Sequence, residues 1–186
     1  KLYGELASYF SVPGIKNISY YEFDNGTFGG TKPFDAKDAI LAETLLTVDS
    51  YNKFTAVSVV GAQSWSQSAQ YGAMISGFAN NRSYANEDWF ISPAMDLSGK
   101  TSVNLAFDHA RGPAGSINVG VNQGYYTVWV SNNYESGAPA TATWTEIKGV
   151  NHGNTAWGFV FSGTLSIPSE NLKANARIAF KYLCTD

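Results

Sequence analysis

A run of bulky apolar residues closed by a proline constrains the fold of this 186-residue chain more than any other feature. Trp89, Phe90 and Ile91 follow one another, so an extended segment there has both of its faces covered. Pro93 lacks the N–H that a strand ladder needs, so it ends the strand or places it at an edge. The sequence therefore predicts a strand that is buried on both faces and stops just before the proline.

A second strand is predicted immediately after this run. Residues 97–100, Leu-Ser-Gly-Lys, form a turn, and apolar and polar positions then alternate through residues 102–109. One face of the predicted strand carries Val103, Leu105, Phe107 and His109, and the other carries Asn104, Ala106 and Asp108. The two segments together predict a strand–corner–strand unit of an all-β sandwich, around which the other segments pack.

Short alternating segments recur along the rest of the chain. They lie at residues 54–60, 71–76, 125–131, 144–148, 157–161 and 176–182. Aromatic residues make up 15% of the chain and glycine occurs 18 times, which is typical of short strands joined by tight turns. The sequence thus predicts about eight or nine strands in a sandwich or jelly roll, with almost no helix.

Several motifs carry a family resemblance. They are Asn-Glu-Asp-Trp-Phe-Ile-Ser-Pro-Ala-Met-Asp-Leu at 86–97, Val-Asn-Leu-Ala-Phe-Asp-His at 103–109, and shorter matches at 59–65, 128–134, 143–146, 161–163 and 178–182. In this order the motifs resemble the choice-of-anchor J domains and the cleaved-adhesin domains that accompany gingipain-type proteases. The resemblance covers residues 41–186, which would form the sandwich domain, and leaves residues 1–40 as an N-terminal extension.

The resemblance implies a fold and a function. The fold is a jelly-roll-like β-sandwich, similar to galactose-binding and MAM domains. The function is that of a non-catalytic cell-surface binding module of an exported bacterial protein, which binds a glycan or a host or cell-surface protein. The implied location is extracellular, on the bacterial surface, with lipid anchoring through a segment outside this chain as one route there. A structural spacer that displays neighbouring domains is the alternative, and a glycan-processing enzyme is less favoured.

The N-terminal extension carries two further expectations. Residues 18–23 are a candidate strand, followed by turn residues. Residues 35–46 are a candidate helix with Asp35 as its N-cap, because Ile40, Leu41 and Leu45 make a partial apolar stripe. The part from residue 41 to residue 46 also suits a strand.

The C-terminal strand carries an expectation of its own. In the resembled family another strand follows the one at residues 178–182, whereas this sequence ends at Asp186. We therefore expect a groove or a bare edge beside this strand, unless residues 1–40 supply a substitute.

The charge and hydropathy of the chain exclude several partners. A formal net charge of −3 leaves no basic field for nucleic acid or for an anionic membrane surface. No stretch approaches the ~20 apolar residues that cross a bilayer, so we expect no membrane insertion in this chain. The single cysteine, Cys184, excludes an internal disulfide and a cysteine-based zinc site.

Signatures of catalysis are missing from the sequence. Gly-x-Ser-x-Gly, His-Glu-x-x-His and phosphate-loop motifs do not occur. His109 shares a strand face with apolar residues, which favours a hydrogen-bonded core histidine, and His152 lies in a polar loop. We therefore expect no catalytic residue and no cofactor other than a structural calcium ion. The candidate ligands of this ion are Asp24, Glu43, Asp49 and Asp108. No EF-hand spacing organises them, so each is alternatively a solvated surface carboxylate.

Aromatic residues in loops are the candidate binding site. Trp65 follows the segment at 54–60, and Tyr84 lies beside Arg82 ahead of the Trp89 strand. Flat rings stack on the apolar faces of sugars while neighbouring amide and guanidinium groups bond the hydroxyls. Loops from different strands gather at the ends of a jelly roll, so we expect one patch made of Trp65, Gln67, Asn81, Arg82 and Tyr84. Packing at the open end of the sandwich is the alternative, above all for Trp65.

Overall fold

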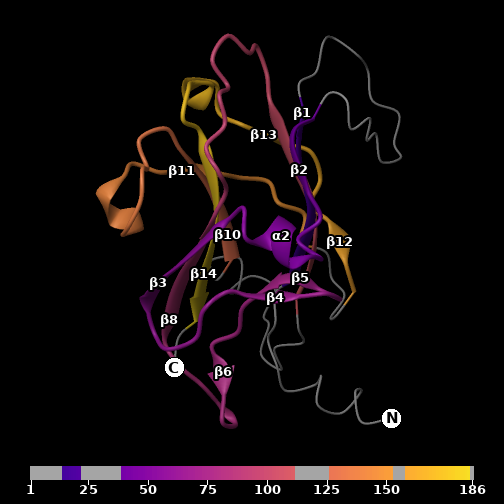
Figure 1. Cartoon of the computed structure of the whole chain (residues 1–186), viewed down its shortest axis with the longest axis vertical. Coiled ribbons are helices and arrows are strands. Elements are labelled where there is room, and N and C mark those ends of the chain that lie inside the picture. Colours follow the sequence, from indigo (N-terminus) through magenta and orange to yellow (C-terminus); the bar gives the residue numbers. More distant parts are fainter. Residues whose placement is uncertain (1–13, 22–38, 112–125, 153–157, 185–186) are drawn as a thin grey trace.

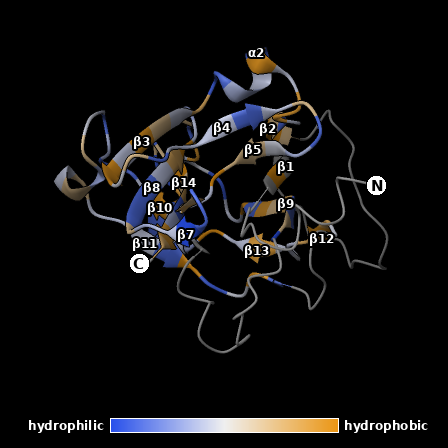
Figure 2. Ribbon diagram, turned by 90° about the horizontal axis from the view of Figure 1, so that it is seen from below, coloured by the Kyte–Doolittle hydropathy of each residue, from blue (hydrophilic) through white to orange (hydrophobic). Residues whose placement is uncertain are grey.

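Antiparallel strands dominate the described part of the chain, which comprises residues 14–21, 39–111, 126–152 and 158–184 of a computed structural model (Figure 1). Helical segments in these ranges are short: α2 (Val48–Tyr51) and two 3-10 turns, η4 (Pro139–Thr141) and η5 (Ser169–Asn171). The strands form two large sheets, which Figure 2 shows from below as two layers with β8, β10 and β14 in one and β1, β5 and β9 in the other. The predicted all-β sandwich is confirmed, while its jelly-roll topology stays a prediction.

The first sheet has seven strands among the described residues. They are β1 (Gly14–Tyr21), β2 (Ala39–Glu43), β4 (Ser66–Ser68), β5 (Gly72–Met74), β9 (Asn104–Ala110), β12 (Val160–Phe161) and β13 (Leu165–Ser166). β1 pairs with β9 along one edge and with β2 and β5 along the other. The described residues of the predicted N-terminal extension, 14–21 and 39–40, therefore form β1 and the start of β2 in this sheet.

Strand β2 replaces much of the helix that the sequence suggested. From residue 39 onward the helix prediction is wrong, and the strand alternative holds with different bounds; residues 35–38 lie outside the described part of the chain. The apolar stripe there is too short to stabilise an isolated helix. Pairing with β1 satisfies the backbone, and Ile40 and Leu41 pack against the main core from the strand.

The second sheet has five strands among the described residues, in the order β11-β10-β14-β8-β3. They are β3 (Thr55–Val60), β8 (Asn86–Ile91), β10 (Tyr126–Ser131), β11 (Thr145–Ile147) and β14 (Arg177–Cys184). β14 lies in the middle, with β10 on one side and β8 on the other. The expectation of a bare edge beside Ile178–Tyr182 is thus wrong, and no residue before 41 is needed to fill that edge. Among the described strands, β3 and β11 stand at the two ends of this sheet.

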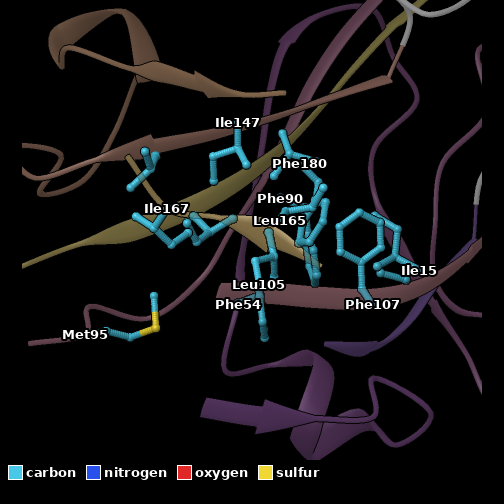
Figure 3. Close-up of a cluster of buried hydrophobic side chains, with 14 of the residues drawn as sticks. Ile15, Phe54, Phe90, Met95, Leu105, Phe107, Ile147, Leu165, Ile167 and Phe180 are labelled. Carbon is cyan, nitrogen blue, oxygen red and sulfur yellow. The ribbon is translucent and has the colours of Figure 1, made fainter. Parts of the chain in front are cut away.

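The main core lies between the two sheets and contains side chains from both β8 and β9 (Figure 3). β8 belongs to the five-stranded sheet and β9 to the seven-stranded sheet, so the turn between them is the predicted corner. Phe107 of β9 meets Phe180 of β14 edge to face, with ring centroids 5.1 Å apart. Buried Ile15 of β1 adds to the same cluster. This packing fixes which face of each strand points inward.

Both faces of β8 are covered, as the sequence predicts. Phe90 points into the main core, where its ring stacks on Phe54 at 4.9 Å and on Tyr51 at 5.0 Å. Trp89 and Ile91 point the other way into a second, smaller cluster on the outer face of the five-stranded sheet. The segment between β10 and β11 contributes to that outer cluster, since Tyr134 is one of its buried members.

Candidate functional site

The predicted patch of loop residues is only partly assembled. Trp65 is 5% exposed and its ring lies 5.4 Å from that of Phe90, so the packing alternative holds for this residue. A ring in that position offers no face to a sugar. Gln67 donates from Nε2 to the carbonyl of Leu46 at 2.9 Å, which ties β4 to the chain ahead of α2.

Arg82 and Tyr84 do come together, beside a two-stranded hairpin of β6 (Phe78–Ala79) and β7 (Arg82–Ser83). Asn80 and Asn81 hold the left-handed φ values of 49° and 61° that its two-residue turn requires. Figure 1 shows this hairpin projecting below the two sheets.

One face of the Tyr84 ring is already occupied in this hairpin. The Arg82 guanidinium lies 4.3 Å from the ring centroid. Hydrogen bonds with Arg82 and Asn80 hold the pKa of Tyr84 below its ordinary value. Arg82 and Tyr84 therefore already interact with each other, and a ligand would have to stack on the other face of the Tyr84 ring.

The three candidate calcium ligands that the structure describes do not form a metal-binding group. Glu43 is buried and accepts hydrogen bonds from Ser50 and Lys53, so its charge is already balanced. Asp49 is exposed in α2, Asp108 is buried in β9, and Asp24 lies outside the described residues. Within the described ranges, no three histidine, cysteine, aspartate or glutamate side chains form a group that could hold a metal ion.

His109 is a buried, neutral histidine. It is 3% exposed, and its Nε2 lies 2.9 Å from the carbonyl oxygen of Asn151, so this nitrogen carries the proton. Burial lowers the pKa of His109 to about 4. The ring of His152 meets it edge-on at 5.6 Å. The predicted core histidine is what the structure contains.

A group of aromatic rings on the outer face of the five-stranded sheet was not singled out by the sequence. We call Trp89, Trp129, Tyr134 and Trp144 the outer aromatic cluster. Ring centroids of Trp89 lie 6.3 Å from Trp129 and 5.1 Å from Trp144, and Tyr134 lies 5.4 Å from Trp144. The rings come from β8, β10 and the segment leading into β11, and they meet only in the folded chain.

Two of these rings reach the surface. Trp89 and Tyr134 are buried, whereas Trp129 and Trp144 are half-buried and lie over them. Each indole N–H is already bonded: Trp129 to Thr127 at 2.7 Å, Trp144 to the Pro139 carbonyl at 2.9 Å. These bonds fix the ring orientations before any ligand arrives, so little conformational entropy remains to be lost on binding.

The alternation of residues in β10 is the sequence pattern from which this cluster could have been predicted. Val128 and Val130 point into the main core, so Trp129 must lie on the opposite face, where a sandwich strand usually carries polar residues. A tryptophan at such a position needs a reason, which is either a covering loop or a ligand.

Charged groups border the outer aromatic cluster. Lys181 Nζ lies 3.1 Å from Glu87 Oε1 and 5.0 Å from the centroid of the Trp89 ring. Partial burial raises the pKa of Glu87, but hydrogen bonds from Trp89 and Lys181 and the Lys181 charge outweigh this and hold it below its usual value. Glu146 is the cross-strand partner of Trp129. Carboxylate acceptors and an ammonium donor thus stand beside the half-buried rings.

Comparison of the chain with protein-family models, with curated proteins and with solved structures gives no match. The resemblance to choice-of-anchor J and cleaved-adhesin domains therefore stays a prediction. In the part of the chain that the structure describes, none of the helices has the length and apolar character needed to cross a membrane.

Proposed function

We propose that this chain is a non-catalytic binding module that recognises carbohydrate on the outer face of its five-stranded sheet. The observation that supports this most is the exposure of Trp129 and Trp144 over a buried aromatic base. A sugar ring has apolar C–H faces, which stack on such indoles, and hydroxyls, which bond charged groups at the edge. Lys181 and Glu87 supply one donor and one acceptor at that edge.

The affinity of such a surface for one sugar chain is weak. Two half-buried rings and one half-buried ion pair correspond to a Kd of ~0.1–1 mM for a single site, or about −4 to −5.5 kcal/mol. Modules of this kind gain strength by being displayed in several copies. The proposed setting, which the family resemblance implies, is the surface of a bacterial cell, where an exported multidomain protein meets a glycan or a glycosylated protein partner.

A structural spacer is the second candidate. It is favoured by the tight closure of the outer cluster, in which Tyr134 is 2% exposed and donates from its hydroxyl to the Gly137 carbonyl at 2.9 Å. In that case Trp129 and Trp144 serve only to cover Trp89 and Ile91, and no ligand is involved.

A glycan array separates these candidates. The wild-type chain, displayed in several copies, is compared with folded Trp129→Ala and Trp144→Ala variants. The matched control is Phe161→Ala, because Phe161 is 40% exposed and lies in the other sheet. The proposal expects binding that both tryptophan variants lose and the control keeps. An array on which the wild type binds no glycan supports the spacer.

The hairpin gives a separate arm of the same experiment. A Tyr84→Ala variant removes the only ring of the Arg82–Tyr84 pair. If this variant loses the glycan and the tryptophan variants keep it, the binding surface is the hairpin and the outer aromatic cluster is structural.

A further inference from the structure

Four buried polar atoms without partners come from two segments that meet near the start of β8. Among the described residues, five buried side-chain nitrogen or oxygen atoms make no hydrogen bond, and four of them come from segments 63–65 and 86–88. They are Gln63 Oε1, Trp65 Nε1, Asn86 Oδ1 and Asp88 Oδ1. Buried polar atoms are normally satisfied, so this concentration points to something that occupies the site.

The two segments are held against each other by the Asn86 amide. Asn86 is 2% exposed and Asp88 is 0% exposed, and both share the inward face of β8 with Phe90. Asn86 Nδ2 donates to Asp88 Oδ2 at 2.8 Å and to the Gln63 carbonyl at 3.1 Å. A carboxylate and a main-chain carbonyl therefore both lie within hydrogen-bond distance of the Asn86 amide nitrogen.

Gly61 brings the turn after β3 directly against this group. Its φ of +95° is one that residues with side chains rarely adopt, and a Cβ there would lie 2.5 Å from Asn86 Oδ1 and 2.6 Å from the Ala85 carbonyl oxygen. The turn can approach these oxygens only because residue 61 has no side chain. One more main-chain oxygen therefore faces the same place.

Asp88 carries a carboxyl group that is buried from water. Among the described residues, no lysine, arginine or histidine forms an ion pair with it. A buried carboxylate needs either a proton or a positive ion beside it. A proton satisfies one oxygen, whereas a cation satisfies several at once.

We propose that Asp88, Asn86 and Gln63 form a binding site for an oxygen-preferring cation of the Ca²⁺ type. Such ions take six to eight oxygen ligands from carboxylates, amide and main-chain carbonyls, and water. The three unpartnered side-chain oxygens and the nearby carbonyls of Gln63 and Ala85 are ligands of this kind. Water on the ion would accept the N–H of Trp65. The site uses none of the carboxylates that the sequence suggested.

The ion would fasten the 61–65 turn onto β8, independently of any glycan. With a single carboxylate the affinity is low, with a Kd of ~0.1–1 mM, in the range of extracellular calcium modules. Saturating Ca²⁺ near 5 mM is then expected to raise the Tm by about 3–6 °C, because only the folded chain binds it.

Thermal unfolding of chelator-treated protein tests the site, with 5 mM CaCl₂, MgCl₂ or additional NaCl in separate arms. We expect a saturable rise in Tm with Ca²⁺, which would identify Ca²⁺ as the bound ion. A rise with Mg²⁺ or Na⁺ instead would mean that the same oxygen ligands bind that cation. In Asp88→Asn, which keeps the side-chain shape, the rise is expected to vanish. In Asp49→Asn, which removes an exposed carboxylate of α2, it is expected to remain.

Two results overturn the proposal. A Tm that none of the cations changes means that waters or a proton occupy the site. A Ca²⁺ response that survives in Asp88→Asn places the ion elsewhere. If Asp88→Asn does not fold, Gln63→Ala replaces it, because Gln63 lies half-buried in the turn and supplies one oxygen. That variant is expected to bind Ca²⁺ several-fold more weakly, and an unchanged Kd contradicts the site.

Discussion

Trp89 and Phe90 are neighbours in β8 but lie in different hydrophobic clusters, one on each face of the five-stranded sheet. Phe90 is fully buried between the sheets, and Trp89 is 6% exposed beneath Trp129 and Trp144. The single peptide bond between them connects the main core to the candidate binding face. Damage to one cluster should therefore be separable from damage to the other.

The first prediction compares these two residues. Phe90→Ala and Trp89→Ala are each expected to lower the free energy of unfolding by ~3–5 kcal/mol, because each leaves a large cavity. Urea unfolding followed by circular dichroism measures both. An unchanged midpoint for Trp89→Ala would show that the outer cluster is not a packed core.

The second prediction uses two glycines with similar backbone conformations. Gly61 and Gly99 have φ values of +95° and +75°, but only a Cβ at residue 61 meets other atoms, and none lies within 4 Å at residue 99. Gly99→Ala is expected to lower the free energy of unfolding by about 1 kcal/mol, from backbone strain alone. Gly61→Ala is expected to cost about 1–3 kcal/mol more, because of the clash with Asn86. Equal costs in urea unfolding would mean that the turn at residue 61 does not press on Asn86.

The third prediction concerns pH. His109 titrates near 6.5 when unfolded and at about 4 when folded, because burial disfavours its charged form. Between these values the unfolded state binds more protons, so stability is full above pH 6.5 and falls as the pH drops toward 4. The decrease in the free energy of unfolding that is attributable to His109 is about 3 kcal/mol.

Urea unfolding at intervals from pH 7.5 to pH 4.5 measures this slope, with His109→Gln as the comparison. The substitution is expected to flatten the slope between pH 6.5 and 5, whatever it does to stability at pH 7.5. A slope that His109→Gln leaves unchanged would assign the titration to other groups, such as His152, whose pKa is also lowered by burial.

Strands with clean alternation could be predicted from sequence. β9 and β14 were found with bounds within a few residues, since apolar positions with a period of two are a local property. β2 was predicted mainly as part of a helix, because apolar residues there fall at a partial helical spacing, whereas its pairing with β1 is a non-local contact. The order of strands in the sheet is a non-local property, which is why the predicted bare edge at β14 was wrong.

The candidate site could be predicted only in part for a related reason. Alternation shows that Trp129 and Val128 lie on opposite faces, but not which face a loop will cover. The polar neighbours of Trp65 left both a binding ring and a packed ring open, and the fold buries this ring against Phe90. Arg82 and Tyr84 were placed together correctly, because they are two residues apart at the end of a hairpin.

The fourth prediction tests the central claim, that the outer aromatic cluster binds carbohydrate. An NMR titration with an oligosaccharide selected on the array gives the Kd of the wild type, of Phe161→Ala and of a Trp129→Ala, Trp144→Ala double variant. All three are first shown to be folded by their amide spectra. If the outer aromatic cluster binds carbohydrate, we expect a Kd of ~0.1–1 mM for the wild type and the control, and binding at least about tenfold weaker for the double variant. A folded double variant that binds with the wild-type Kd would contradict it.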